Sequence, residues 1–131
     1  MKYILDTDIL IYLLKGQPNV VERVTAFADE ELATTIINQT ELLAGVFNSE
    51  RKVENLKNVE ALLNRIAIVP FCQKASYIFA EHKAQLKKQG TLIDDFDLMI
   101  ASIALQNKSI LVTNNTKHFS RIKKLEIENW S

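Results

Sequence analysis

The sequence predicts an α/β fold, a three-layer sandwich in which helices flank a central parallel sheet of four to five short strands. Short apolar runs alternate with helical patterns along the whole chain. One or two helical segments separate successive strands, as parallel pairing requires. No linker, repeat or biased tract interrupts the 131 residues, so we expect a single domain over residues 1–131.

The first half of the chain predicts two strands and four helices. Tyr3–Leu5 is an apolar run that ends abruptly at Asp6 and indicates a buried strand. Leu32–Ile37 is rich in β-branched residues and indicates the second strand. Gly16, followed by Pro18, marks the end of the first helix. The four helices are expected at Ile9–Lys15, Asn19–Ala28, Thr40–Phe47 and Arg51–Arg65.

The second half predicts two or three further strands and two helices. Pro70 closes the first of these strands, and Gly90 ends a long helix. The strands are expected at Ala67–Val69, at Ile110–Thr113 and, at an edge of the sheet, at Leu125–Ile127. The helices are expected at Lys74–Lys88 and Phe96–Asn107.

The composition excludes several classes of protein. Lys and Arg number 16 and balance 16 Asp and Glu, which argues against non-specific coating of nucleic acid. One cysteine, Cys72, and two histidines provide neither an internal disulfide nor a zinc framework. No apolar run approaches the roughly 20 residues that span a bilayer, and Asp6 interrupts the N-terminal apolar run. We therefore expect an intracellular protein without membrane association.

Acidic and amide side chains stand near the ends of the predicted strands. Asp6 and Asn115 follow the first and fourth strands, Glu41 opens the helix after the second, and Asp95 and Asp97 begin a later helix. Parallel strands gather such residues at one edge, where open α/β sheets bind ligands. Converging carboxylates repel unless a cation neutralises them, and Mg²⁺ or Mn²⁺ suits oxygen ligands. The pattern predicts metal-assisted hydrolysis of phosphoesters or phosphodiesters.

Most of these residues also have a structural interpretation. Glu41 lies three residues after Asn38, the spacing of a capping box. Asp94 suits the positive end of a helix dipole, and Asp8 suits the N-cap of the first helix. Asp97 fits such an interpretation less well, because apolar or small residues occupy its helical stripe.

Four segments, in order, resemble PIN-domain toxin ribonucleases of the VapC type. The family's opening resembles the segment from Ile4 to Gly16, which begins Ile4-Leu5-Asp6-Thr7-Asp8. Its second acidic motif resembles Thr40-Glu41-Leu42-Leu43-Ala44-Gly45. Its third resembles Asp97-Leu98-Met99-Ile100-Ala101, and its fourth resembles Leu111-Val112-Thr113-Asn114-Asn115. The ending Glu128-Asn129-Trp130 is typical of the subgroup that cleaves initiator tRNA in its anticodon stem-loop.

This resemblance implies a PIN-like fold and a metal-dependent endoribonuclease whose substrate is tRNA. It implies Asp6 and Asp97 as the main Mg²⁺ ligands, with Mn²⁺ able to substitute and Asp95 as an auxiliary ligand. Glu41 would orient or deprotonate the attacking water, or add a ligand. Many members have aspartate where this chain has Asn115, which is uncharged and is expected to contact a metal-bound water or a phosphate. That departure weakens the case for a second metal and is compatible with one.

Basic residues must hold the RNA backbone. Lys117 and Arg121 lie just beyond the fourth strand, and Lys83 and Lys87 lie toward the end of the long helix. A solvated face is the more common reason for such residues. His118 is a further candidate for a phosphate contact.

The resemblance also implies partners. An antitoxin of the VapB type would insert a peptide into the acidic groove, place a basic side chain near the carboxylates and supply operator DNA binding. Homodimers and toxin–antitoxin hetero-oligomers in a prokaryotic cytoplasm are the implied setting. Ile11, Leu14, Val20 and Val24 offer apolar helix surface for such contacts.

Two other interpretations remain open. Ile4–Asp8 also fits the opening of a haloacid-dehalogenase-type phosphatase, but Leu10 stands where that family expects Thr or Val. Its last acidic pair should follow a strand, whereas Asp94 and Asp95 precede a helix. A catalytically weak PIN module that binds RNA or protein is the other alternative.

Overall fold

The computed structural model describes residues 1–131 and contains a five-stranded sheet of order β3-β2-β1-β4-β5. Every neighbouring pair of strands is parallel. The strands are β1 (Tyr3–Leu5), β2 (Leu32–Thr35), β3 (Ala67–Val69), β4 (Ile110–Val112) and β5 (Ile127–Glu128). Because all strands run the same way, their carboxyl ends meet at one edge, with β1 in the middle.

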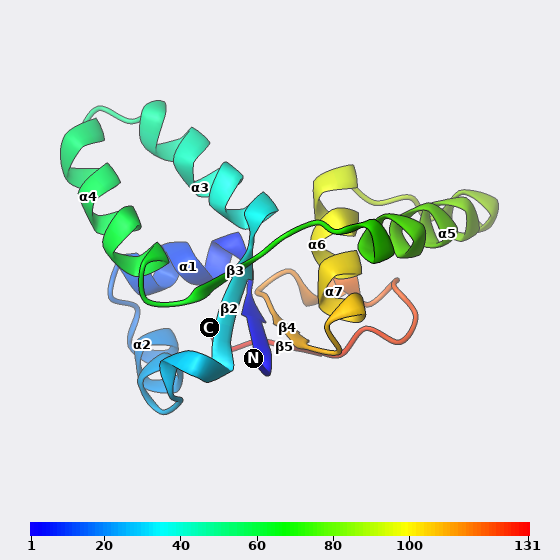
Figure 1. The fold of residues 1–131 in the computed structure, drawn as a ribbon, viewed down its shortest axis with the longest axis horizontal. Helices are drawn as coiled ribbons and strands as arrows, with labels where there is room; N and C mark the ends of the chain where they lie inside the picture. Colours follow the sequence, from blue (N-terminus) through cyan, green and yellow to red (C-terminus); the bar gives the residue numbers. More distant parts are fainter.

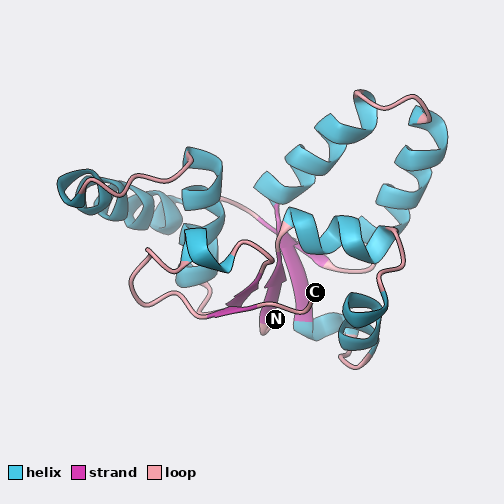
Figure 2. Ribbon diagram, turned by 180° about the vertical axis from the view of Figure 1, so that it is seen from behind, coloured by secondary structure: helices cyan, strands magenta, loops and turns pink.

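Helices cover both faces of the sheet and confirm the three-layer prediction (Figure 1). One group is α1 (Thr7–Leu14), α2 (Pro18–Thr25), α3 (Ile36–Phe47) and α4 (Lys52–Leu63). The other is α5 (Gln73–Gln89), α6 (Asp95–Gln106) and α7 (Thr116–Phe119). Figure 2 shows the same separation from behind, with the strands between the two groups. None of the helices is both long and apolar enough to cross a membrane.

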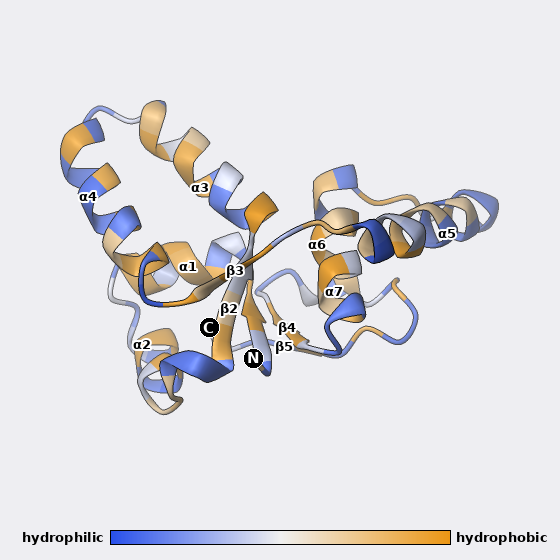
Figure 3. Cartoon of the chain, in the orientation of Figure 1, coloured by the Kyte–Doolittle hydropathy of each residue, from blue (hydrophilic) through white to orange (hydrophobic).

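The two faces of the sheet bury two separate apolar clusters. Ile4 of β1 belongs to the cluster beneath α5 and α6, whereas Tyr3 and Leu5 belong to the cluster beneath the first four helices. This alternation is the pleat of a strand buried on both faces. In Figure 3 the strands are mainly apolar while the outer helices carry the polar residues. The layers therefore hold β1, and the residue after it, in a fixed place.

The end of the chain packs on its beginning. Trp130 is only 3% exposed, and its ring lies 5.0 Å from that of Tyr3 and 5.5 Å from that of Phe27. Arg23 lies over the Trp130 ring and pairs with Glu128 at 3.3 Å. These contacts fasten β5 and the residues after it to β1 and α2.

Side-chain capping shifts several element ends from their predicted places. The first helix begins at Thr7, because Asp6 and not Asp8 is its N-cap. β2 ends at Thr35, which caps α3 in a reciprocal capping box with Asn38, so the predicted box from Asn38 to Glu41 was wrong. The short helix α7 was not predicted. Such shifts follow where polar side chains satisfy the first free N–H groups of a helix.

Candidate active site at the carboxyl edge of the sheet

Asp6 lies at the centre of this edge and is held from three directions. Oδ1 accepts hydrogen bonds from Thr7 N at 2.9 Å and Asn38 Nδ2 at 3.0 Å, and Oδ2 accepts one from Thr113 Oγ1 at 2.7 Å. Asn38 and Thr113 follow β2 and β4, the two neighbours of β1. Burial raises the pKa of Asp6, while these donors act in the opposite direction. Asp6 is thus a buried carboxylate of fixed orientation.

Asn38 links Asp6 to Glu41. Its side chain is fully buried, and its Nδ2 donates both to Asp6 and to Thr7 Oγ1, the latter at 2.9 Å. Thr7 Oγ1 in turn donates to Glu41 Oε1 at 2.6 Å. Burial, together with the charge of Asp6, raises the pKa of Glu41. The two carboxylates are therefore positioned by one continuous chain of hydrogen bonds, which the sequence did not predict.

Asp97 joins them from the first turn of α6 on the other side of the sheet. Burial and the negative charge of Asp6 raise its pKa to about 6, and Glu41 adds to the effect. Because the charge of Asp6 acts on both Glu41 and Asp97, the three predicted carboxylates form one electrostatic site. His118 Nε2 lies 3.1 Å from Asp97 Oδ2 and opposes the rise.

Asp8 is a further carboxylate at this edge. Burial and the charge of Asp6 raise its pKa to about 6. Its oxygens accept hydrogen bonds from Ile9 N at 2.7 Å and from Asn114 N at 3.0 Å. Asp8 therefore fastens α1 to the loop after β4 instead of capping the helix.

The donor set of this edge fits a hard divalent cation. No group of three or more Asp, Glu, His or Cys side chains is already gathered at metal-ligand distance. Asp6 nevertheless raises the pKa of both Glu41 and Asp97, and Glu41 raises that of Asp97, so a cation among them would remove that penalty. Glu41 and Asp97 are only partly buried, whereas Asp6 is buried. Carboxylate oxygens are also the ligands that Mg²⁺ prefers.

The remaining predicted residues surround this centre. Asn115 precedes α7, and its backbone N–H donates to Thr113 Oγ1 at 3.0 Å. Asp95 pairs with Lys83 at 2.9 Å, and both side chains are largely exposed. Lys87 is exposed on α5.

Two more basic residues, Lys117 and Arg121, lie in and just after α7, where both are exposed. Arg121 Nη1 reaches the Leu92 carbonyl at 3.5 Å. Asp94 caps α6 by accepting from Phe96 N at 3.1 Å, which confirms its structural interpretation.

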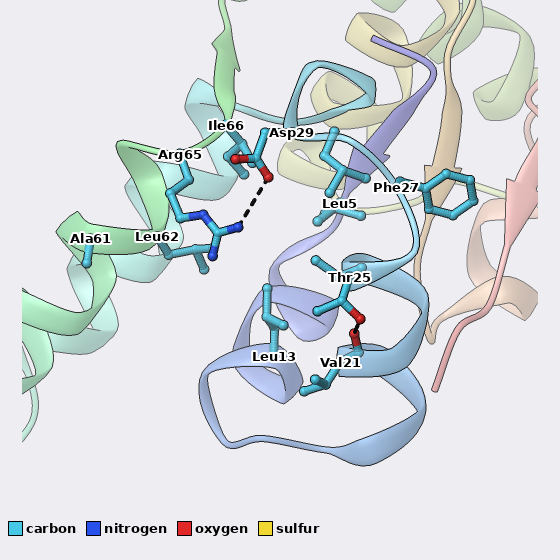
Figure 4. Close-up of a pocket in the computed structure, with 12 residues that line it drawn as sticks. Leu5, Leu13, Val21, Thr25, Phe27, Asp29, Ala61, Leu62, Arg65 and Ile66 are labelled. Carbon is cyan, nitrogen blue, oxygen red and sulfur yellow. Dashed lines mark hydrogen bonds and ion pairs between the residues drawn. The ribbon is translucent and has the colours of Figure 1, made fainter.

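Two hollows adjoin the first group of helices. One, of about 510 Å³, is apolar, lies between α1, α2 and α4, and contains the Arg65–Asp29 ion pair (Figure 4). It does not reach the carboxylates. The other, of about 540 Å³, runs between α1, α3 and α4 and includes Glu41 in its lining, beside Ile11 and Leu14. Of these two hollows, the second is the one that reaches Glu41 at the acidic edge.

The sequence did not predict the contacts that three residues make in the site. Asn38 and Thr7 serve Asp6 and Glu41, and His118 faces Asp97. The Thr113 hydroxyl, from the fourth predicted segment, holds Asp6 as well. The available signal was indirect: polar residues next to strand ends are candidates to hold the carboxylate at the neighbouring strand end.

Known proteins match this chain over nearly its whole length. Residues 3–125 match the model of the PIN domain family. "Ribonuclease VapC2" of Rickettsia felis is 35% identical, covering 99% of this chain and 98% of the relative. "tRNA(fMet)-specific endonuclease VapC" of Shigella flexneri is 31% identical, covering 100% and 99%.

A solved structure shows the same architecture. The crystal structure of VapBC2 from Rickettsia felis, bound to a DNA fragment from their promoter, contains a chain that superposes with a TM-score of 0.94. The two chains are 34% identical, and 100% of each is covered. On the sequence matches and on this fold, the chain belongs to the PIN domain family.

Proposed function

We propose that this chain is the toxin of a toxin–antitoxin pair and an endoribonuclease that hydrolyses RNA phosphodiester bonds with a divalent cation. The observation that carries this proposal is the buried Asp6, fixed by three donors and coupled to Glu41 and Asp97. Relatives matching end to end are named ribonucleases, and nucleases of the PIN family generally use divalent metal ions. The family assignment removes the support for a phosphatase.

The cation is proposed to be Mg²⁺, with Mn²⁺ able to substitute, held by Asp6 and Asp97. When bound, it lowers the pKa of a water and offsets charge on the phosphate. Glu41 keeps Oε1 on the Thr7 hydroxyl, which leaves Oε2 to orient the attacking water and accept its proton. Attack in line on phosphorus leaves a 5′-phosphate and a 3′-hydroxyl. Asn115 is proposed to contact the phosphate or its water.

The substrate is proposed to be tRNA. Support comes from a relative whose name specifies tRNA(fMet), and the anticodon loop of initiator tRNA is the first site to test. Lys117 and Arg121 on one side, and Lys83 and Lys87 on the other, are proposed to hold the RNA backbone. Asp95 is proposed as an auxiliary metal ligand, which requires release of its ion pair with Lys83.

A VapB-type antitoxin is the proposed partner, since structural relatives are VapBC complexes. The groove of about 540 Å³ presents Ile11 and Leu14, 37% and 38% exposed, with Glu41 in the same lining. An apolar segment with one basic side chain would match it. Val20 is fully buried, so it belongs to the core and not to the surface that such a segment would contact.

The proposed setting completes this assignment. We propose that residues 1–131 act as one domain and that two copies form a homodimer. Binding of the antitoxin would then produce a larger hetero-oligomer. Operator DNA would be bound through the antitoxin alone. The cytoplasm of a prokaryote is the proposed location, because tRNA lies there.

Cleavage of total RNA tests this function. Protein free of antitoxin is incubated with total RNA and Mg²⁺ or Mn²⁺, and new 5′ ends are sequenced. We expect a discrete cut in tRNA, abolished by EDTA and by Asp6→Asn. Asp29→Asn is the matched control, because Asp29 pairs with Arg65 on the surface. Full activity of Asp6→Asn would remove the assignment, and no cut with either metal would favour the binding module.

A further inference from the structure

His118 presents a shielded ring nitrogen to the carboxylate edge. Its Nε2 is excluded from solvent and makes no hydrogen bond, although Asp97 Oδ2 lies 3.1 Å away in an unsuitable direction. A shielded nitrogen without a partner costs free energy. The arrangement therefore calls for a partner that is neither water nor the Asp97 carboxylate alone.

The ring is held in place by its own helix. Phe119, the next residue, is 1% exposed and packs in the cluster beneath α5 and α6. The two rings meet edge to face with centroids 5.8 Å apart. Since Phe119 anchors α7 against the core, His118 faces Asp97 as part of the fold and not as a loose surface side chain.

The distance between the two side chains suits two ligands of one ion. Ligands at right angles on a metal, each about 2.1 Å from it, lie about 3 Å apart. Nε2 and Oδ2 are 3.1 Å apart. An ion between them would give the shielded Nε2 a partner and would relieve the repulsion around Asp97 at the same time.

We propose that His118 Nε2 is a direct ligand of the catalytic cation and that it raises the affinity of the site for Mn²⁺ relative to Mg²⁺. The inference rests on the proposed function, because it assumes that Asp6 and Asp97 hold a divalent ion. His118 then supplies a donor in the region where Asn115 brings no charge. Imidazole is a common ligand of transition metals, whereas Mg²⁺ takes oxygen ligands and retains its water. A nitrogen ligand therefore shifts selectivity toward Mn²⁺.

The chain allows a direct spectroscopic test because it contains only two histidines, His118 and His82. Full-length protein, stripped of metal with EDTA and dialysed, is loaded with Mn²⁺ alone. Pulsed electron paramagnetic resonance then measures whether a ¹⁴N nucleus is coupled to the manganese. We expect coupling in the wild type, no coupling in His118→Ala and unchanged coupling in His82→Ala. His82, on α5, is the matched control and assigns the signal even where His118→Ala fails to fold.

Calorimetric titration measures the consequence for affinity. Changing a group that merely orients a ligand weakens metal binding by about 10–100-fold, so His118→Ala should raise the Kd for Mn²⁺ at least ten-fold. His118→Glu restores a ligand of the oxygen type and should lower the ratio of the Mg²⁺ Kd to the Mn²⁺ Kd by at least about ten-fold.

The outcomes separate this inference from the proposed function. Mn²⁺ binding without ¹⁴N coupling overturns the role of His118 and leaves the metal-dependent nuclease intact. Coupling that disappears in His82→Ala also overturns it, because the ligand is then the other histidine. No binding of either ion by the wild type overturns both proposals.

Discussion

Three donors reach the two carboxylate oxygens of Asp6, and Asn38 is the one whose side chain links Asp6 to the Thr7 hydroxyl that holds Glu41. Its side-chain amide donates hydrogen bonds to Asp6 and to the Thr7 hydroxyl, and that hydroxyl donates to Glu41. The amide thereby fixes the two carboxylates relative to each other. On its other side, its Oδ1 accepts from Thr35 Oγ1 at 2.7 Å. Asn38 is therefore a positioning residue, and its loss should affect the chemical step more than RNA binding.

Replacement of Asn38 by leucine tests this role. Leucine keeps the volume but removes the amide, so we expect kcat to fall at least about ten-fold with little change in KM. Stability should fall by about 1–3 kcal/mol, because buried partners are left unsatisfied. Cleavage kinetics on an RNA oligonucleotide and urea unfolding provide the two measurements.

The matched control is Asn107→Leu. Asn107 Nδ2 donates to the Ile103 carbonyl at 2.8 Å, at the far end of α6. We expect that variant to lose stability while keeping kcat. Equal kcat in both variants would show that Asn38 contributes to folding only.

At the scale of single residues, the sequence predicts the carboxylates of the site but not the side chains that contact and orient them. Asp6 and Asp97 stand out because a carboxylate beside an apolar strand or on an apolar helix stripe needs a partner. Asn38 and His118 do not stand out, since their partners lie 32 and 21 positions away, Asn38 from Asp6 and His118 from Asp97. Only the tertiary fold brings such pairs into contact.

Among the elements, β5 depends most on a single side chain. β5 has two residues, too few to be stable by its own pairing, and Trp130 packs just beyond it on Tyr3 and Phe27. We expect Trp130→Ala to lower the free energy of unfolding by about 3–5 kcal/mol. Urea denaturation followed by circular dichroism measures the loss. Tyr77→Ala, at a position 71% exposed, should change stability by less than about 1 kcal/mol.

The end of α5 depends on the backbone of one glycine. Gly90 has a φ of +69°, a conformation that side chains disfavour. Gly90→Ala should therefore cost about 1 kcal/mol. An added Cβ meets nothing within 4 Å at either Gly90 or Gly45. Gly45 lies inside α3, where alanine favours a helix more than glycine does, so Gly45→Ala should instead stabilise the protein by up to about 1 kcal/mol. Equal effects of the two changes in urea unfolding would contradict this explanation.

Element types were predictable because each has a strong local period, and element ends were not. The first turn of α1 was assigned to a loop because Asp6 looked like the end of a strand and Asp8 like the cap. In the structure Asp6 has both positions, strand end and N-cap. β2 is shorter than predicted for the same reason, since Thr35 ends the strand and begins α3. Such dual use places the site immediately at the sheet edge.

The stability of the whole molecule depends on pH, because its buried carboxylates are costly to ionise in the folded state. The pKa values of Asp6, Asp8, Glu41 and Asp97 are all raised, those of Asp8 and Asp97 to about 6. Below about pH 4 these groups are protonated in the folded and unfolded chains alike. Stability then falls as pH rises from about 4 to about 6, because the unfolded chain loses these protons first and the folded protein must finally hold charges that burial and repulsion disfavour.

We therefore expect EDTA-treated protein to have a Tm at pH 5 that is at least about 3 °C above its Tm at pH 7.5. Saturating Mn²⁺ should raise the Tm most at pH 7.5, where the carboxylates are free of protons. Asp97→Asn should flatten the dependence on pH in EDTA. Differential scanning fluorimetry at constant ionic strength measures all three effects. A Tm in EDTA that increases from pH 5 to pH 7.5 would contradict the predicted repulsion.

The position of β1 between β2 and β4 also sets when, during synthesis, the protein becomes active. Asp6 leaves the ribosome well before Asp97, Thr113 and His118, which follow it by 91 or more positions. Trp130, which closes the cluster around Tyr3, comes later still. Under the proposed function, a chain whose synthesis stops before Asp97 lacks one of the two metal ligands, so we expect it not to cut RNA while it is still on the ribosome.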